Sequence, residues 1–582
     1  MIKTLLAQVK QYKKASLLTP LYAALEVVME VLIPFITAAI IDKGIEAGSI
    51  AKVYQYGALM LVFAMLSLLF GVLAGRYAAS ASSGLACNLR EAMYDNIQTF
   101  SFSNIDKFST AGLVTRLTTD VTNLQNAYQM ILRMCMRAPA SMIIAMIMSF
   151  YINARLASIY LVAVILLGTC LFLIMRSATK YFEQAFPKYD ELNASVQENV
   201  SAIRVVKAYV REDYETGKFH KASENIYKIF CKAEENLSFN APLMQLTVYS
   251  CILLISWLGA KMIVGSSLST GELMSLLTYC MNILMSLMML SMVFVMITMS
   301  LASARRISEV LNEKSDLDNP ENPDFSIPDG SITFDHVYFN YKKGAGEPVL
   351  SDINLSIQSG ETIGIIGGTG SAKTSLVNLI SRLYDVTDGS VKVGGKDVRS
   401  YDMETLRNEV AVVLQKNVLF SGTILDNLRW GDKNASEEEC KRVCRLACAD
   451  EFIDRMPEGY NTYIEQGGSN VSGGQKQRLC IARALLKKPK VLILDDSTSA
   501  VDTATDAKIR KAFLTEIPET TKLIIAQRIS SVQDADRIIV MENGKVNGFG
   551  SHEELLKTNE IYREVYESQT GGGGDFDEKR GE

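Results

Sequence analysis

Long apolar segments alternate with polar connections over about the first 310 residues of the chain. Six of these segments have the length that a helix needs to cross the roughly 30 Å of hydrocarbon in a bilayer. Short connections follow the first, third and fifth segments, and long polar stretches follow the second and fourth. We therefore predict six membrane-spanning helices, near residues 16–42, 55–79, 132–152, 156–176, 242–264 and 272–301.

The two long polar stretches also have a helical pattern. In the second, residues 177–240, charged and apolar residues recur at helical spacing, and nine of the residues are Lys or Arg. We expect the membrane helices to continue well into the cytoplasm and to turn around there. Separate extramembrane domains are less favoured, because neither stretch contains strand or turn signals. Since cytoplasmic segments carry the excess of positive charge, both termini are expected on the cytoplasmic side.

The pattern changes after residue 312. Residues 313–330 are rich in Pro, Asp and Asn and predict a linker. From 331 to 569, β-branched strands alternate with helical patterns, which is typical of a three-layer α/β domain; a flexible, glycine-rich tail is expected at 570–582. The predicted fold is a multidomain membrane protein, with a six-helix transmembrane domain at 1–312 that has long intracellular helix extensions, followed by the α/β domain.

Composition supports this division. Hydrophobic residues make up 48% of the chain, charged residues 21%, and the mean hydropathy is +0.13, as in a membrane protein with a soluble part. A net charge of −5 gives no reason to expect a nucleic-acid partner. Cys440, Cys444 and Cys448 recur every four residues without histidines at metal spacing, so we interpret them as buried small side chains. The basic, amphipathic N-terminus is expected to form an interfacial helix and not a cleaved signal.

The stretch IIGGTGSAKTSLVNLI resembles a phosphate-binding loop with one substitution. A buried strand precedes it and a helix follows, so loop amides and the helix N-terminus would face phosphate oxygens. In the pattern G-x-x-x-x-G-K-[ST], Lys373 would reach the β and γ phosphates and Thr374 would ligate Mg²⁺. Ala372 replaces the last glycine, a mild steric change without loss of charge, so binding is expected to survive. The candidate ATP-binding loop comprises Gly367, Gly368, Thr369, Gly370, Ser371, Ala372, Lys373, Thr374 and Ser375.

Two further segments belong with this loop. In PKVLILDDSTSAVD, four apolar residues precede Asp495, which predicts a buried strand that places a carboxylate beside the phosphate loop, where it can hold Mg²⁺. Between the two lies VSGGQ, which opens another helix with Ser472 and two glycines. Nucleotide-related elements about a hundred residues apart, separated by a helical stretch, form a specific combination.

With these motifs in this order, the chain is similar to half-transporters of the ATP-binding cassette (ABC) exporter family over nearly its whole length. The resemblance implies a membrane domain followed by a P-loop nucleotide-binding domain with a helical subdomain, and ATP and Mg²⁺ as its ligands. It implies that Tyr341 stacks on adenine and that Gln415 reaches Mg²⁺ together with Thr374 and Asp495. It also implies that turns near 109–116 and 198–204 are coupling helices that dock on the cassettes.

The resemblance assigns two more segments to communication between two cassettes. The signature, which contacts ATP held by the opposite cassette, corresponds to Val471, Ser472, Gly473, Gly474 and Gln475. The loop through which the two ATP sites communicate corresponds to SAVD, with Ser499 and Asp502.

Two positions depart from the pattern of an active hydrolase in this family. Asp496 stands where the family normally has the glutamate that polarises the attacking water, and aspartate is one methylene shorter. A displacement of about 1 Å at a reacting group can cost about 100-fold in rate. Gln527 stands where a histidine normally contacts the γ-phosphate, and glutamine has no protonatable nitrogen. Together with Ala372, these departures indicate a site that binds ATP and turns it over poorly.

The intact signature favours a heterodimer over a homodimer. A homodimer would have two impaired sites and little hydrolysis, whereas a partner half-transporter with a complete glutamate and histidine would use the good VSGGQ of this chain. Such mixed pairs are known among heterodimeric bacterial multidrug exporters, which the chain resembles. ATP hydrolysis is then expected mainly at the partner's site, in an assembly in a bacterial plasma membrane with both termini and the cassette cytoplasmic.

Residues in the membrane half offer two candidates for a substrate path. Methionines recur every three or four residues along the sixth predicted span, and methionine suits a surface that accepts many shapes; helix packing or lipid contact is an equal alternative. Glu26 and Glu30 lie one turn apart in the first span, where carboxylates are costly unless they face a cavity or a partner. Arg133 and Arg137 could be that partner, and a counter-charge for cationic amphiphiles is the alternative. The methionines are Met281, Met285, Met288, Met292, Met296 and Met299.

The leading hypothesis is one half of an ATP-driven exporter of lipophilic or amphipathic compounds that works by alternating access. One alternative within the transporter class is export of lipid or peptide. Another is a regulatory subunit in which ATP binding, without turnover, sets a conformation.

Overall fold

The structure of the chain is a computed structural model that describes residues 1–341, 346–497 and 500–570. By its internal contacts the chain divides into two compact units. The first comprises Met1–Thr99 and Phe108–Lys314; the second comprises Phe100–Lys107 and the chain from Ser315 onward. Most of the predicted tail, residues 571–582, lies outside the described residues.

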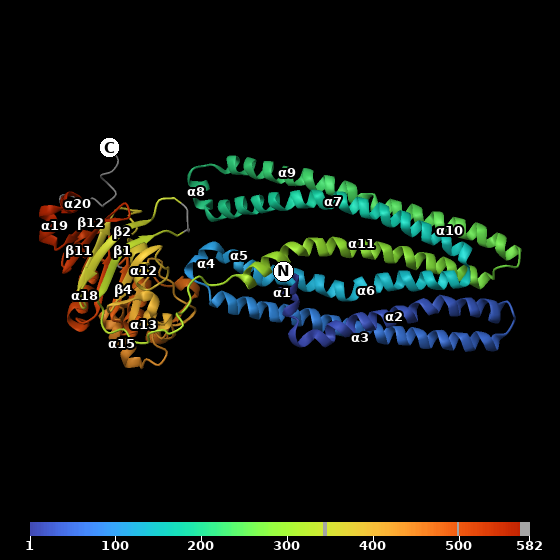
Figure 1. Cartoon of the computed structure of the whole chain (residues 1–582), viewed down its shortest axis with the longest axis horizontal. Helices are drawn as coiled ribbons and strands as arrows, with labels where there is room; N and C mark the ends of the chain where they lie inside the picture. Colours follow the sequence, from blue (N-terminus) through green and yellow to red (C-terminus); the bar gives the residue numbers. More distant parts are fainter. Residues whose placement is uncertain (342–345, 498–499, 571–582) are drawn as a thin grey trace. The chain divides into compact units, whose positions relative to one another are not determined.

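The first unit consists of helices (Figure 1). Within the described ranges, six helical segments are long and apolar enough to span a membrane, which confirms the predicted number, and each predicted span lies within one of them. These segments are Lys10–Ile45, Ile50–Gln98, Thr110–Ile152, Ala154–Tyr181, Glu212–Val264 and Thr270–Asn312. The helices of the unit are α1 (Ile2–Ala7), α2 (Lys13–Ile40), α3 (Ile50–Gln98), α5 (Thr110–Thr115), α6 (Val121–Ile152), α7 (Ala154–Ser201), α8 (Ile203–Ala208), α9 (Glu212–Ser238), α10 (Asn240–Val264) and α11 (Thr270–Asn312), with π-helical turns at Ile41–Ile45 and Arg116–Asp120.

Several of these helices are much longer than a bilayer requires. α3 has 49 residues and α7 has 48, which at 1.5 Å per residue gives about 70 Å, roughly twice the thickness of the hydrocarbon core. The long polar stretches therefore continue the membrane helices, as predicted. Local signals fix where helices begin: the side chain of Asn153 accepts hydrogen bonds at the start of α7, and Ser269 and Glu272 form a capping box at the start of α11.

Polar groups inside this unit join helices that are distant in sequence. The buried carboxylate of Asp120, just before α6, accepts hydrogen bonds from the Ser303 hydroxyl at 2.8 Å and from Arg306 Nε at 2.7 Å, both on α11. The buried Tyr160 and Tyr279 donate their hydroxyl hydrogens to backbone carbonyls of α11 and α2, respectively. Because a buried polar group without a partner is costly, these bonds select one arrangement of the helices.

The second unit is the predicted α/β domain and contains two main sheets (Figure 1). In the six-stranded sheet, with the order β12-β11-β3-β10-β9-β6, all strands are parallel except the edge strand β12. The second sheet, β2-β1-β4-β5, is antiparallel. The strands are β1 (Ile332–Phe339), β2 (Leu350–Ile357), β3 (Thr362–Gly367), β4 (Asp388–Val393), β5 (Lys396–Asp397), β6 (Val410–Val413), β7 (Gly422–Thr423), β8 (Tyr463–Ile464), β9 (Val491–Asp495), β10 (Thr521–Ile525), β11 (Arg537–Glu542) and β12 (Lys545–Gly550).

The second unit also contains helices. They are α4 (Phe102–Lys107), α12 (Lys373–Ile380), α13 (Met403–Glu409), α14 (Ile424–Leu428), α15 (Glu437–Leu446), α16 (Asp450–Ile453), α17 (Gly473–Leu486), α18 (Thr503–Glu516), α19 (His552–Thr558) and α20 (Glu560–Thr570). Every residue of β3, β9 and β10 is buried, which explains why these strands are near-continuous apolar runs in the sequence. Cys440, Cys444 and Cys448 are buried in the hydrophobic core around α15 and α17, as predicted.

Candidate functional site

The carboxyl ends of three neighbouring parallel strands hold the residues that the sequence singles out. β3 ends at Gly367, and its partner β10 ends at Ile525, two residues before Gln527. β9 pairs with β10 so that Asp495 lies opposite Ile525. Because parallel strands present their carboxyl ends at one edge of a sheet, the phosphate loop, the two aspartates and Gln527 meet there.

The backbone of the phosphate loop requires glycine at its first position. At Gly367, a Cβ atom would lie 2.3 Å from the carbonyl oxygen of Met541 on β11, so any side chain would collide with the neighbouring strand. Gly370 has a φ of +83° and would meet no atom within 4 Å, so the outer side of the loop is open. A loop that is fixed on one side by the sheet and open on the other suits the approach of phosphate oxygens to backbone amides.

Ala372 lies in a strained backbone conformation. Its φ and ψ are +70° and +25°, the left-handed region, and it directly precedes α12. Glycine adopts this conformation without penalty, whereas a residue with a Cβ pays about 1–2 kcal/mol. The substitution therefore acts mainly on the backbone of the loop, and the steric contact with phosphate that the sequence suggested is a second effect.

Lys373, Thr374 and Asp495 form the charged part of the site. The ammonium of Lys373 donates to the carbonyls of Gly367 at 2.8 Å and Gly368 at 2.9 Å. The hydroxyl of Thr374 donates to the carboxylate of Asp495 at 2.9 Å. Burial raises the pKa of Asp495, and the charge of Asp496 adds to this, while the Thr374 hydroxyl and the Lys373 ammonium oppose it. The buried carboxylate is thus destabilised until further positive charge arrives.

Asp496 and Gln527 face each other across the ends of β9 and β10. The side-chain amide of Gln527 donates to Asp496 Oδ2 at 3.4 Å. The backbone of Asp496 is held in the left-handed region, with a φ of +48°, and its amide donates to the carbonyl of Ile525. The structure therefore brings together the two positions that depart from the pattern of an active hydrolase.

Tyr341 lies beside the helix that follows the phosphate loop. Its hydroxyl is 2.8 Å from that of Ser375 on α12, and 44% of the residue is exposed. Its ring packs edge-on against those of Phe339 and Tyr384, with centroids 4.8 and 5.1 Å away. One ring face next to the loop is thus fixed by aromatic neighbours, as a base-stacking role requires.

The VSGGQ segment forms the N-terminus of α17. Ser472 caps the helix in a capping box with Gln475, and Ser472 and Gly473 are exposed, while Val471 is buried beneath them. A Cβ on Gly474 would lie 2.7 Å from the carbonyl oxygen of Ala500, so this glycine allows close approach of the SAVD loop. Asp502 caps α18 by accepting from the Thr505 amide; Ser499 lies outside the described residues.

Known protein families match both parts of the chain. Residues 17–288 match the family described as ABC transporter transmembrane region, and residues 350–499 match the family described as ABC transporter. YfiB, an ABC transporter ATP-binding protein of Bacillus subtilis, is 37% identical over 549 residues, which cover 94% of this chain and 95% of the relative. Rv1273c of Mycobacterium tuberculosis is 35% identical over 98% of each chain.

The chain belongs to the ABC exporter family. It is a half-transporter, with a transmembrane part and an ATP-binding part in one polypeptide. A solved structure of a bacterial Atm1-family ABC exporter with ATP bound matches 96% of this chain and 99% of its own with a TM-score of 0.82; at 23% sequence identity, this shows the shared fold.

The cassette of this ABC exporter binds ATP, and the residues of its loop fit that ligand. The outer side of the loop is open at Gly370, and the Lys373 ammonium already lies over the loop. For Mg²⁺, Thr374 and Asp495 offer neighbouring oxygens, and Gln415 follows β6, the strand next to β9, with an exposed side chain. These three residues would hold the ion, which would neutralise phosphate charge.

The part of the first long polar stretch that belongs to the cassette unit lies earlier in the chain than the expected coupling segment at 109–116. The segment Phe100–Lys107, which includes α4, belongs to the cassette unit, whereas α5, within the expected 109–116, belongs to the membrane unit. Tyr384 donates its hydroxyl hydrogen to Asp106 at 2.7 Å, and its ring lies 6.0 Å from that of Phe102. Burial raises the pKa of Tyr384, and the charge of Asp106 adds to this.

The coupling role of 109–116 stays a prediction, and the contacts of Phe100–Lys107 depend on side chains that carry no motif. Ser101 and Ser103 donate to the carboxylate of Asp316, which attaches α4 to the chain after the membrane helices. Tyr384 then contacts both α4 and Tyr341, so one ring separates this helix from the predicted adenine-stacking residue. The second predicted coupling segment, 198–204, covers the end of α7 and the start of α8 and stays a prediction.

In the membrane part of the exporter, the acidic and basic residues pair. Arg137 on α6 bridges Glu26 and Glu30 on α2, with 2.9 Å between Arg137 Nη2 and Glu30 Oε2. Glu26 is buried, and its Oε2 has no hydrogen-bond partner among the described residues. The structure thus contains the ion pair that the sequence offered as one alternative, while the side chain of Glu30 is 45% exposed.

The methionine positions on α11 are largely open in the single chain. Met281, Met285, Met288 and Met292 are 42%, 59%, 47% and 64% exposed. Met296 is partly exposed, and nothing is described of the Met299 side chain. A row of flexible apolar side chains is therefore available to a substrate, a lipid or a second chain.

Sequence reasoning missed Gln477. This buried side chain on α17 accepts from the Ala500 amide at 3.0 Å and donates to the carbonyl of Asp496 at 3.5 Å. Gln477 therefore connects α17 to Asp496, which directly follows β9, and to Ala500 within the SAVD loop. A polar residue on the apolar face of a helix is the signal that could have indicated it.

Replacing Ala372 with glycine tests the strain in the loop. Glycine removes the left-handed penalty but has more freedom in the unfolded chain, so Ala372→Gly is expected to stabilise the cassette by about 0.5–1 kcal/mol. Ala507→Gly, in the helical interior of α18, is the matched control and should destabilise by about the same amount. Thermal unfolding of the full chain measures both; loss of stability in both variants would contradict the assigned conformation.

The raised pKa of Asp495 predicts that its carboxylate lowers the stability of the cassette without nucleotide and contributes to Mg²⁺ binding. The cost of the buried carboxylate appears as pH rises from its ordinary pKa of 3.8 through the raised value, because the folded state then has to release the proton. Asp495→Asn should therefore raise the unfolding temperature without nucleotide at pH 7, with the gain vanishing near pH 4. It should also remove the extra stabilisation that Mg²⁺ adds to ATP. A variant less stable than the original chain at pH 7 would contradict this.

Proposed function

We propose that this chain is the degenerate-site subunit of a heterodimeric, ATP-driven exporter of lipophilic and amphipathic compounds. Its own site binds ATP with Mg²⁺ and hydrolyses it poorly. Its signature completes the ATP site of a partner half-transporter, where most hydrolysis occurs. The assembly moves its substrates across a bacterial plasma membrane by alternating access.

The pair formed by Asp496 and Gln527 carries the proposal. In a cassette that hydrolyses ATP, a carboxylate at the end of β9 orients the attacking water, and a displacement of about 1 Å costs about 100-fold in rate. The Asp496 side chain is one methylene shorter than glutamate, its backbone is fixed, and the Gln527 amide lies 3.4 Å from it. The Gln527 amide can donate a hydrogen bond but cannot exchange a proton. Asp496 and Gln527 therefore do not replace the glutamate and histidine of an active site.

The exposed signature supports a partner with a complete site. Ser472 and Gly473 form an exposed, capped helix N-terminus. A surface of this kind can bind the phosphate of an ATP molecule that is held by another chain. Gln477, on the same helix, accepts a hydrogen bond from the Ala500 amide and so connects this helix to the SAVD loop. A well-formed signature beside a weakened catalytic pair has a use only if another chain provides the catalytic glutamate and histidine.

The membrane helices favour an apolar substrate. The exposed methionines on α11 provide a flexible and polarizable surface. Because Arg137 already pairs with both Glu26 and Glu30, little charge is left to select cations. We therefore place lipophilic compounds ahead of strongly charged substrates.

Lipid transport is a second candidate. A relative from Desulfotalea psychrophila, named ATP-dependent lipid A-core flippase, is 34% identical over 483 residues, which cover 83% of this chain and 84% of the relative. Acyl chains would contact the same methionine surface. Vesicles that contain the purified pair distinguish the candidates, since movement of a labelled lipid and export of a lipophilic dye are measured separately.

Introducing glutamate at position 496 and histidine at position 527 should restore ATP hydrolysis by this chain. In the chain purified alone, Asp496→Glu combined with Gln527→His is expected to raise ATP turnover by about 100-fold, because the carboxylate regains its reach. Asp496→Asn is the control and should remain at the low rate of the unaltered chain. Phosphate release measures the rate; brisk turnover by the unaltered chain alone would overturn the proposal.

Blocking the signature should stop hydrolysis at the partner's site. In the pair co-purified from native membranes, Ser472→Arg places a bulky side chain on the exposed helix N-terminus and should reduce ATP turnover by at least 10-fold. Ser551→Arg is a matched control, because Ser551 caps α19 in the same kind of capping box away from the site. Equal turnover in the two variants would show that the signature of this chain serves no hydrolytic site.

A further inference from the structure

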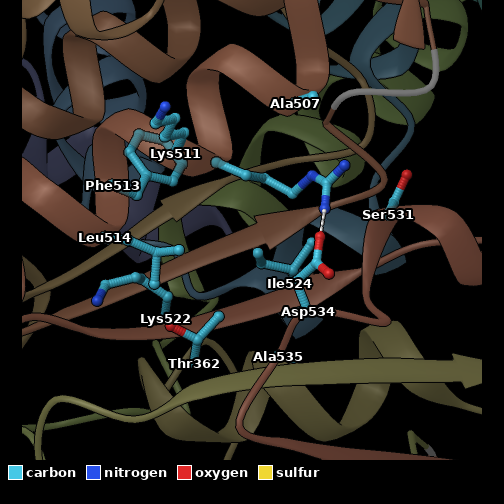
Figure 2. Close-up of a pocket in the computed structure, with 11 residues that line it drawn as sticks. Thr362, Ala507, Lys511, Phe513, Leu514, Lys522, Ile524, Ser531, Asp534 and Ala535 are labelled. Atoms are coloured by element: carbon cyan, nitrogen blue, oxygen red, sulfur yellow. Dashed lines mark hydrogen bonds and ion pairs between the residues drawn. The ribbon is translucent and has the colours of Figure 1, made fainter. Parts of the chain in front are cut away.

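A cavity of about 250 Å³ is lined by residues of β3, β10, α18 and the segment 531–535 (Figure 2). Thr362 is the first residue of β3 and Lys522 the second of β10, and both line it. The phosphate loop and Gln527 follow the opposite ends of these strands. The cavity is therefore separate from the ATP site.

The cavity is lined by a lysine that is almost completely buried. Lys522 is 1% exposed, and none of the ion pairs found among the described residues involves its ammonium. Burial lowers the pKa of Lys522, and the more distant carboxylate of Asp536 only partly opposes this. The hydroxyl of Thr362 is also buried without a partner in the described part of the chain. Such groups are costly to bury unless a ligand pairs with them.

The other charged groups at the cavity are already engaged or lie at its mouth. Arg510 on α18 forms ion pairs with Asp534 at 3.2 Å, drawn in Figure 2, and with Asp506 at 3.3 Å. Lys511 is exposed and adds positive charge near the opening. The Lys522 ammonium and the Thr362 hydroxyl remain for a ligand, together with Arg510 Nε, which is buried without a hydrogen-bond partner in the described part of the chain. Because Asp506 and Asp534 already balance the charge of Arg510, this set of donors suits a single negative charge.

The rest of the lining is apolar. Phe513 and Ile524 are buried in the wall, and Ala507, Leu514 and Ala535 complete it, with Leu514 51% exposed. A small hydrated anion would leave these surfaces in contact with water. An anion that carries an aliphatic chain would cover them and gain from their burial.

We propose that this cavity binds an aliphatic carboxylate, with the carboxylate on Lys522 and Thr362 and the chain against Phe513 and Ile524. The ligand would contact α18, which starts directly after Asp502, and the segment 529–535, which follows Gln527. The two segments already contact each other through Arg510 and Asp534, and through Ser531 and Asp506 at 3.2 Å. An occupied cavity would therefore stabilise the base of both loops at the nucleotide site.

Equilibrium dialysis of labelled octanoate against the full chain in lipid nanodiscs, without nucleotide, tests the proposal. After subtraction of empty nanodiscs, one saturable site per chain is expected. Excess hexanoate should compete for it, whereas octanol and inorganic phosphate should not, because they lack either the charge or the chain. The absence of a saturable component, or equal competition by octanol or phosphate, would overturn the proposal.

Variants assign the binding to this cavity. Lys522→Met keeps the stem of the side chain and removes its charge, so it should weaken octanoate binding at least 10-fold. Leu514→Asp places a negative charge at the mouth on an exposed position and should weaken binding similarly, without disturbing the buried strand. Thr515→Asp, one residue further along α18 and outside the cavity lining, is the matched control and should bind as the unaltered chain does. Unchanged binding in Leu514→Asp would place octanoate elsewhere.

Discussion

The parallel pairing of β3, β10 and β9 places three loops at one edge of the six-stranded sheet, and the nucleotide chemistry of the chain depends on it. The pairing sets Asp495 opposite Ile525 and Ile525 opposite Ile365. The Thr374 hydroxyl consequently reaches Asp495, and Gln527 reaches Asp496. Complete burial of these strands fixes the edge, so a change of one side chain there alters chemistry without altering the arrangement. A site of this kind can lose hydrolysis and keep ATP binding.

Contacts within the cassette connect this edge to other segments of the unit. Gln477 connects the signature helix to the residues around Asp496 and Ala500, and Tyr384 connects Tyr341 to α4. In the membrane part, helices of nearly fifty residues continue past the bilayer, and buried groups such as Asp120 lock them together.

Periodicity and short motifs predicted the elements of this chain, but not the contacts between them. The six spans, the buried strands and the placement of Asp495 follow from apolar runs of fixed length, which depend on local sequence. The left-handed conformation of Ala372, the position of α4 in the cassette unit and the buried charge of Lys522 depend on residues far apart in the chain. The ion pair between Arg137 and the two glutamates was one of two alternatives, since spacing alone cannot say which side of a helix meets a partner.

A single turnover of the pair co-purified from native membranes gives the most direct test of unequal ATP sites. The pair is loaded with labelled ATP, started with Mg²⁺ and quenched after the fast phase, and the bound ATP and ADP are counted. If Asp496 and Gln527 make the site of this chain degenerate, about one ATP per pair remains intact while the other is converted to ADP. Conversion of both in the same phase would show that Asp496 is a competent base, and the two sites would then be equal.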